Sequence, residues 1–131
     1  MKIRICFLVM MLAPLFYYGA IQLAPAGRAA TVSTGFRRLG QAALAKIESA
    51  QDAQSEPDSV YDSRIVEAES ALAIANTAAV SAADRRDYTR LVTYLHDVKQ
   101  DRILMQASSD PGSVDHEQAN AARESAERTF K

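Results

Sequence analysis

The chain opens on an apolar run that differs from everything after it. Residues 5–23 carry no charge and are mostly apolar, and the cations Lys2 and Arg4 precede them. Small residues follow, with an A-x-A pattern that ends at Ala26 and a second small-residue pattern that ends at Ala29. A positive start, an apolar core and small residues before a cut are typical of a secretory signal peptide. We therefore expect a hydrophobic leader helix that is cleaved after Ala26 or Ala29.

The length of the apolar run leaves a second interpretation open. Residues 5–23 make a run of 19, and an α-helix of roughly 20 apolar residues crosses a bilayer. Segment 1–29 is therefore either a signal peptide or an uncleaved single-span anchor. Both place the rest of the protein outside the cytoplasm. A cleaved protein is periplasmic or secreted, and an uncleaved one is an inner-membrane protein with an extracytoplasmic domain, the only case in which we expect membrane contact.

The next apolar positions recur at helical spacing from Thr34 to about Gln54. The larger ones fall three to five residues apart, which predicts an amphipathic α-helix; they are Phe36, Leu39, Leu44 and Ile47. Ser33 or Thr34 offers a hydroxyl that can accept from a free N–H of the first turn. Pro57 disfavours the helical conformation at the preceding residue, so this helix is expected to end before it.

A second helix is predicted from Ser59, where Ser59 and Asp62 have the spacing of a capping box with Asp in place of the usual Glu. Its apolar stripe alternates intervals of four and three residues, which is the heptad spacing of a helix packed along its length against another. The stripe consists of Tyr61, Ile65, Ala68, Leu72, Ala75, Ala79 and Ala82. Its many alanines predict close packing against an antiparallel neighbour.

The stripe breaks at the charged segment 84–87, after which a new apolar series begins at Tyr88 and continues to Met105. Ser81 and Asp84 offer another capping pair. The break is either a tight turn between two helices or a change of phase in one helix over residues 60–106. We favour the turn, because one helix of that length would extend for about 70 Å and leave its apolar stripes hard to bury.

Turn-forming residues at 108–113 predict a loop. The following segment, 114–131, has only a weak apolar face formed by Ala119, Ala122, Ala126 and Phe130, and we expect it to be loosely docked or partly disordered. The predicted fold is all-α: a three-helix bundle or long helical hairpin over residues 30–107, preceded by the leader helix. Residues 108–131 add a loop and a weakly packed C-terminal helix.

Charge and cysteine content narrow the possible functions. The residues after Ala26 hold all 16 acidic and 13 of the 15 basic residues of the chain. Their net charge is thus −3, and no cluster of Lys and Arg suggests nucleic-acid binding. Cys6 is the only cysteine, so a protein cut after the leader contains no disulfide and no thiol nucleophile. Helix packing alone, or a partner, must then stabilise the domain.

His96 is the best candidate for a reactive group, with Asp97 beside it and Asp101 further along the same predicted helix. A metal site needs about three convergent ligands, and the second histidine, His116, lies beyond the loop. An exposed or half-buried helix histidine is the simpler interpretation. The chain also lacks a Gly-rich phosphate loop and a G-x-S-x-G motif, and we expect no enzymatic activity and no cofactor.

The alanine rhythm of residues 48–107 carries a resemblance. It contains A-x-x-A, then a loop, then A-x-x-x-L-x-x-A, then D-R-R-D-Y and a further apolar helix. This pattern resembles the short, alanine-rich helical-hairpin envelope proteins of bacteria that carry an export leader. The D-R-R-D-Y turn is also similar to the inter-helix turns of tetratricopeptide repeats, but no second copy follows at a period of about 34 residues. The resemblance implies fold and location only.

These observations favour an exported, non-catalytic helical protein of the bacterial envelope that acts through helix–helix contacts with a protein partner or a second copy of itself. The residues expected to make such contacts are Tyr61, Ile65, Leu72, Tyr88, Leu91 and Leu95. Two alternatives stay open. One is a single-span accessory subunit of a membrane complex that keeps the leader, and the other is a small metal-binding or hydrolytic protein that uses His96.

Overall fold

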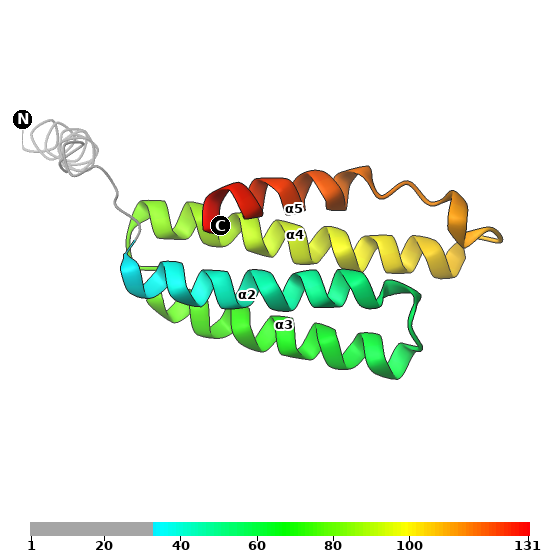
Figure 1. The fold of residues 1–131 in the computed structure, drawn as a ribbon, viewed down its shortest axis with the longest axis horizontal. Helices are drawn as coiled ribbons and strands as arrows, with labels where there is room; N and C mark the ends of the chain where they lie inside the picture. The colour runs from blue at the N-terminus through cyan, green and yellow to red at the C-terminus, as the bar shows by residue number, and fades with distance from the viewer. Residues whose placement is uncertain (1–32) are drawn as a thin grey trace, which may run out of the picture. The chain divides into compact units, whose positions relative to one another are not determined.

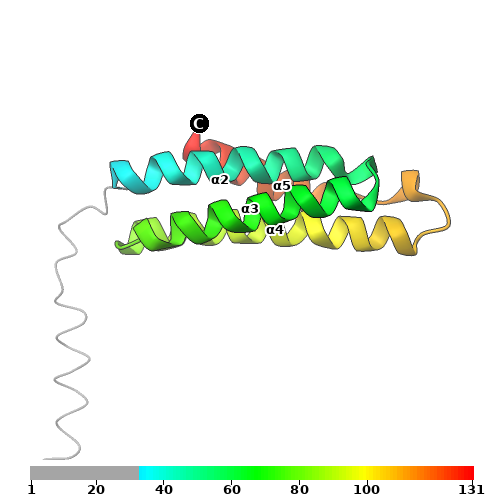
Figure 2. The ribbon, with the colours of Figure 1, turned by 90° about the horizontal axis from the view of Figure 1, so that it is seen from below.

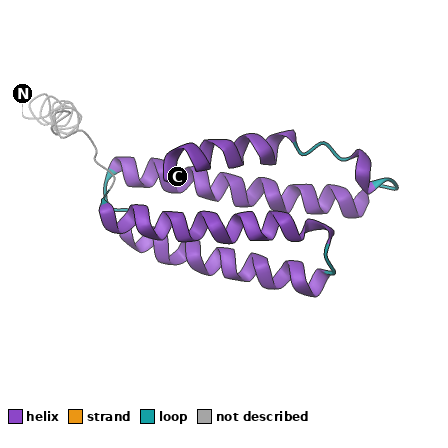
Figure 3. Cartoon of the chain, viewed as in Figure 1, coloured by secondary structure: helices purple, strands orange, loops and turns teal. Residues whose placement is uncertain are grey.

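A computed structural model of the protein describes residues 33–131, and the expected leader at 1–29 lies outside them. The described part is entirely helical, as the sequence predicts, but it has four α-helices (Figures 1 and 3). In chain order these are α2 (Thr34–Asp52), α3 (Asp58–Ala78), α4 (Ala82–Ala107) and α5 (Glu117–Phe130). Two short 3-10 helices, η1 (Ala53–Ser55) and η2 (Pro111–Ser113), lie in the connections. None of the helices in the described part is long and apolar enough to span a bilayer.

The four helices form a bundle in which α2 and α4 are in contact with each other and with both remaining helices. In Figure 2, α3 lies nearest the viewer between α2 and α4, and α5 lies behind them. The two outer helices, α3 and α5, therefore cover opposite sides of the α2–α4 pair. One side of α3 is left facing away from the rest of the bundle.

Helix α2 begins and ends close to where its sequence pattern predicts. The Ser33 hydroxyl accepts a hydrogen bond from the backbone N–H of Phe36 at 3.2 Å, so the expected N-cap is confirmed. Its apolar stripe is fully or almost fully buried in the core, at Phe36, Ala43, Leu44, Ile47 and Ala50. Burial of this stripe supplies most of the apolar contact that α2 makes with the helices around it.

The start of α3 differs from the prediction. The helix begins at Asp58 with Pro57 as its N-cap, and no side chain caps it, so the capping box expected between Ser59 and Asp62 is absent. Proline fixes φ near the helical value, which orders the chain directly before the first turn without a capping side chain. The first five residues of the predicted stripe are buried, but Ala79 and Ala82 are not, because α3 ends at Ala78.

The junction at residues 79–81 is a turn, so α3 and α4 are two helices as favoured from the sequence. Ser81 caps α4: its hydroxyl accepts from the N–H of Asp84 at 3.0 Å, and the Asp84 carboxylate accepts from the N–H of Ser81 at 3.2 Å. The same carboxylate also accepts from the N–H of Ser33 at 3.0 Å. One buried side chain thus links the start of α4 to the start of α2.

The C-terminal helix is docked more firmly than its sequence suggests. Phe130 is fully buried, and its ring packs edge-on against Phe36 with centroids 5.9 Å apart. Ala119 and Ala126 are also fully buried. The side-chain amide of Gln41 donates to the backbone carbonyl of Phe130 at 2.7 Å. Residues 108–131 thus form a connection and then a helix, as expected, but the helix is packed firmly on the bundle, because one aromatic side chain compensates for the small alanine face.

Candidate functional site

Five of the six residues expected to contact a partner lie in the core of the protein itself. Tyr61, Ile65, Leu72, Leu91 and Leu95 are each 8 % exposed or less, and Tyr88 is partly buried against them. The structure thus places these side chains in or against the core of the chain itself, although Tyr61 and Ile65 also line a groove at the surface. Helical periodicity identifies a buried stripe but not whether the stripe meets the same chain or another one.

On α3, the residues that directly follow the buried stripe form an exposed surface beside α4. On α3, residues 62, 66, 69 and 73 recur at intervals of four and three, and on α4 the matching positions face the same side. We call this surface the outer α3–α4 face; its residues are Asp62, Val66, Glu69 and Ala73 of α3, and Arg85, Tyr88, Val92, Lys99 and Ile103 of α4. Val66 is 60 % exposed, Ile103 is 55 % exposed and Val92 is 40 % exposed.

A groove runs along part of this face between the two helices. Asp62, Ile65, Lys99 and Ile103 line it together with Tyr61 and Arg102. Nearby, the Lys99 ammonium forms an ion pair with the Glu69 carboxylate of α3 across the gap between the helices. Its lining combines apolar side chains, Ile65 and Ile103, with charged ones, Asp62 and Lys99, and protein interfaces likewise combine an apolar centre with a polar rim.

Arg102 holds the α2–α3 connection onto α4 at the end of this groove. Its guanidinium donates to the carbonyls of Gln54 and Glu56 and pairs with the Asp58 carboxylate. The guanidinium carbon also lies 4.9 Å from the centre of the Tyr61 ring, within the range of a cation–π contact. These contacts make Arg102 a structural clamp, and they leave it little freedom to bind a ligand.

Tyr61 has a hydroxyl that is buried without a hydrogen-bond partner among residues 33–131. Burial raises the pKa of this phenol to about 12, and the nearby Arg102 only partly offsets the effect. A phenol with so high a pKa stays neutral in water at physiological pH, so it is unsuited to act as a base.

The two histidines have different environments. His96 is exposed on α4, whereas His116 stands just before α5 and its Nδ1 lies 2.8 Å from the Asp101 Oδ2. Asp101 is 4 % exposed. Because an ionised carboxylate can only accept, this contact fits the tautomer in which Nδ1 carries the hydrogen and donates a hydrogen bond to Asp101. The carboxylate considered as a neighbour of His96 is therefore paired with the other histidine.

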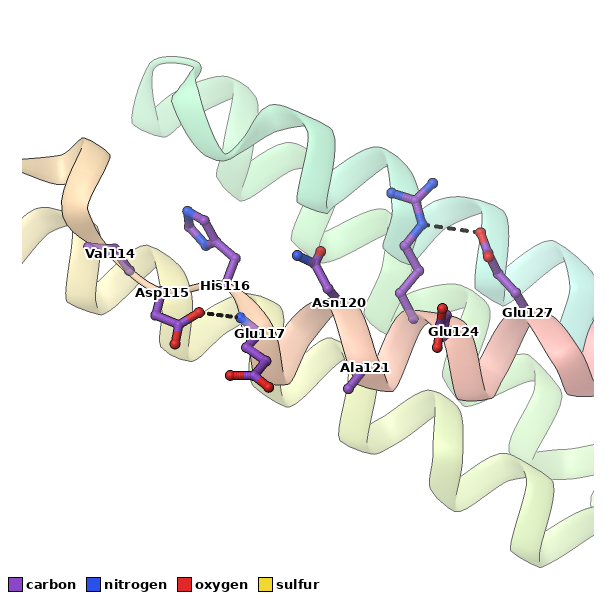
Figure 4. Close-up of a pocket in the computed structure, with 9 residues that line it drawn as sticks. Val114, Asp115, His116, Glu117, Asn120, Ala121, Glu124 and Glu127 are labelled. Carbon is purple, nitrogen blue, oxygen red and sulfur yellow. Dashed lines mark hydrogen bonds and ion pairs between the residues drawn. The ribbon is translucent and has the colours of Figure 1, made fainter.

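His116 lies at one end of an open groove along α5 (Figure 4). The His116 ring and the Asn120 amide project on one side, while Glu117 and Glu124 point away from them. Behind them, the side-chain amide of Gln51 donates to Asn120 at 3.1 Å and accepts from the Tyr94 hydroxyl at 2.5 Å. A polar seam thus joins α2 to α5.

Charged groups continue this seam toward the C-terminus. Hydrogen bonds from Lys131 and Arg123 lower the pKa of the Glu127 carboxyl to about 2. Lys131 also pairs with Glu48 of α2 at 2.7 Å. These groups are partly or largely exposed, so each pair contributes little to stability, and their arrangement chiefly fixes how α5 lies on α2.

The polar groups along α5 do not form a reactive centre. A histidine oriented by a carboxylate resembles part of a catalytic triad, but no hydroxyl or thiol is hydrogen-bonded to the His116 ring within the described residues. Nor do residues 33–131 contain a group of three metal-ligating side chains. The sequence did carry one signal for this pair: Asp101 continues the buried phase of Tyr94 and Val98, and a carboxylate in that phase requires a partner.

Comparisons with protein family models, with curated proteins and with solved structures find no match for this chain.

Proposed function

We propose that the protein is an exported, non-catalytic interaction protein of the bacterial envelope, and that it acts through helix–helix contacts. The outer α3–α4 face is the observation that carries the proposal. It presents three large apolar side chains, Val66, Val92 and Ile103, on two neighbouring helices of one small domain. The core beneath them is already closed, so these side chains are not needed to complete the fold.

The incomplete burial of Val66, Val92 and Ile103 leaves free energy to be gained when a partner covers them. Fully burying a Val or Ile side chain contributes about 1.5–3 kcal/mol, and these three side chains retain 40–60 % of their exposure. Covering them with a partner would therefore stabilise a complex by about 1 kcal/mol each. The charged rim of Asp62, Glu69 and Lys99 would add orientation and selectivity more than affinity.

Export rests on the sequence, and the 19-residue apolar run supports a second candidate function. A retained leader would make the protein a single-span accessory subunit that presents the same face to a membrane complex. Mass spectrometry of the intact protein from the cells that produce it separates the two. A mass that corresponds to a chain starting at Gly27 or Ala30 supports the secreted form. A mass that corresponds to a chain starting at Met1 supports the anchored form.

Site-specific photo-crosslinking in those cells tests the contact surface. We would place a photoreactive residue at Val92 on the outer α3–α4 face and, as a control, at Leu104 on a different side of α4. Both positions are exposed, at 40 % and 52 % respectively. Crosslinks to a discrete protein from Val92 and not from Leu104 support the proposal. Equal crosslinking at both positions, or none at either, contradicts it.

A further inference from the structure

We propose that the partner on the outer α3–α4 face is a second copy of this chain, with α3 of each copy lying on α4 of the other. This inference rests on the proposed function, because it uses the same face. A two-fold axis parallel to the helices produces such a pairing, and it makes the interface self-complementary, as in most homodimers.

The apolar positions of the face are spaced for helix packing. Val66 and Ala73 are seven residues apart on α3, with Glu69 between them and Asp62 one turn before Val66. On α4, Val92 and Ile103 are exposed on the matching side. Intervals of seven and of eleven residues both return to nearly the same side of an α-helix. Val66 of one copy thus has an apolar stripe to lie against in the other.

The charges of the two helices are opposite along this face. The α3 edge carries Asp62 and Glu69, and the α4 edge carries Arg85 and Lys99. Glu69 and Lys99 already pair within one chain, so placing α3 on α4 of a second copy brings this pair beside its symmetry mate with acidic positions facing basic ones. Placing α3 on α3 opposes like charges. Like-charge contacts disfavour the wrong pairing by more than the correct pairing gains. Charge complementarity therefore favours the pairing of α3 with α4 of a second copy over that of α3 with α3.

The size of the face predicts the strength of the contact. Helix α3 has 21 residues, so at about 1.5 Å per residue the face is about 30 Å long, and two neighbouring helices make it about 20 Å wide. This gives about 600 Å² per copy and about 1,200 Å² in total, which is the lower end for specific interfaces. We therefore expect a reversible dimer with a dissociation constant in the micromolar range.

The full chain is expressed and the protein is purified. Sedimentation velocity over a range of concentrations then measures its self-association and tests the proposal. The central comparison is Ile103→Asp against Leu104→Asp. These neighbours are similarly exposed, at 55 % and 52 %, but lie about 100° apart around α4. We expect Ile103→Asp to raise the dissociation constant at least tenfold and Leu104→Asp to leave it nearly unchanged. Circular dichroism checks that both variants keep their helices.

A charge exchange identifies which helices meet. Asp62→Lys and Lys99→Glu should each weaken self-association, because each brings like charges together twice across a two-fold interface. Mixing the two variants should restore dimers, since both contacts in the mixed dimer then join opposite charges. If a substitution acted only by disturbing the fold of its own chain, mixing would not restore dimers. Recovery of dimers on mixing therefore supports a contact between the two chains.

Two results would overturn the second copy as partner. One is a wild-type protein that remains monomeric at every concentration, and the other is a dimer that Ile103→Asp and Leu104→Asp weaken equally. The first result together with a Val92-specific crosslink to a different protein would retain the proposed function and reject only self-association. A monomer without any Val92-specific crosslink would reject both.

Discussion

The ring of Phe130 occupies the space where a side chain at Gly40 would lie. A Cβ atom added at Gly40 would be 2.8 Å from the ring Cδ1 and 2.9 Å from its Cζ, and closer still to Cε1. Real Cβ atoms do not approach other atoms so closely. Both residues are buried, so the ring has little room to move away. Because Gly40 has no side chain, the Phe130 ring of α5 can pack against α2 at this position.

Substituting Gly40 tests this contact. We expect Gly40→Ala to lower the free energy of unfolding by about 1–3 kcal/mol, because the enlarged side chain must displace a packed ring. Gly35→Ala is the matched control, since nothing lies within 4 Å of a Cβ there. Alanine is the better helix former, so the control should be neutral or more stable by up to about 1 kcal/mol. Urea unfolding measures both; equal stability of the two variants would contradict the account.

The contact between Gly40 and Phe130 could not be predicted from the sequence, whereas most of the helices could. The helices of residues 34–107 follow from periodicity and turn residues, because those signals are local. Gly40 and Phe130 are 90 positions apart, and no local pattern pairs them. For the same reason the stripe of Tyr61, Ile65 and Leu72 predicts burial but not the element that buries it. These side chains lie in the core of the chain itself, and which element covers a stripe depends on the whole bundle.

The hydroxyls of Tyr61 and Tyr94 predict opposite outcomes for the same substitution. The Tyr61 hydroxyl is buried without a hydrogen-bond partner in the described part of the chain, so Tyr61→Phe removes a desolvated polar group and should leave stability unchanged or raise it by up to about 1 kcal/mol. The Tyr94 hydroxyl donates to Gln51 at 2.5 Å, so Tyr94→Phe should cost about 1 kcal/mol. Urea unfolding at pH 7 compares them, and a loss of stability in Tyr61→Phe as large as in Tyr94→Phe would contradict this prediction.

Alkaline titration gives a second measurement on Tyr61. Burial raises the pKa of its phenol from 10 to about 12, so the folded state favours the neutral form. The stability that this preference contributes is complete below about pH 10 and is lost as pH rises toward 12. Tyr61→Phe cannot ionise and should therefore unfold at higher pH than the wild type. Circular dichroism at increasing pH detects the difference, and coincident curves would count against a buried Tyr61 phenol.

The two histidines should differ sharply in their effect on stability. His116→Ala removes the hydrogen-bond partner of the buried Asp101 carboxylate, and an unpaired buried acceptor costs about 1–3 kcal/mol or more. His96 is exposed, so His96→Ala should change stability by less than about 0.5 kcal/mol. Thermal or urea unfolding compares the variants. The double substitution of His116→Ala with Asp101→Asn should recover part of the loss, since it removes the unpaired charge.

Asp84 predicts how the bundle responds to acid. Burial disfavours its charged form, but hydrogen bonds from the Ser33 and Ser81 backbone and the Ser81 hydroxyl outweigh this, and the pKa of the carboxyl lies below its ordinary value. A carboxyl whose pKa is lowered by folding stabilises the protein above the unfolded-state pKa near 4, and the contribution disappears as pH falls through the lower folded-state value.

Asp84→Asn should therefore be less stable than the wild type at pH 7, with the difference shrinking below pH 4. Asp97→Asn is the control on the same helix, because the Asp97 side chain has no hydrogen bond or ion pair within residues 33–131, and it should change stability at pH 7 by less than Asp84→Asn. Urea unfolding at pH 7, 5 and 3 measures the trend, and a difference that stays constant across these values would show that the Asp84 charge does not hold the two helix ends together.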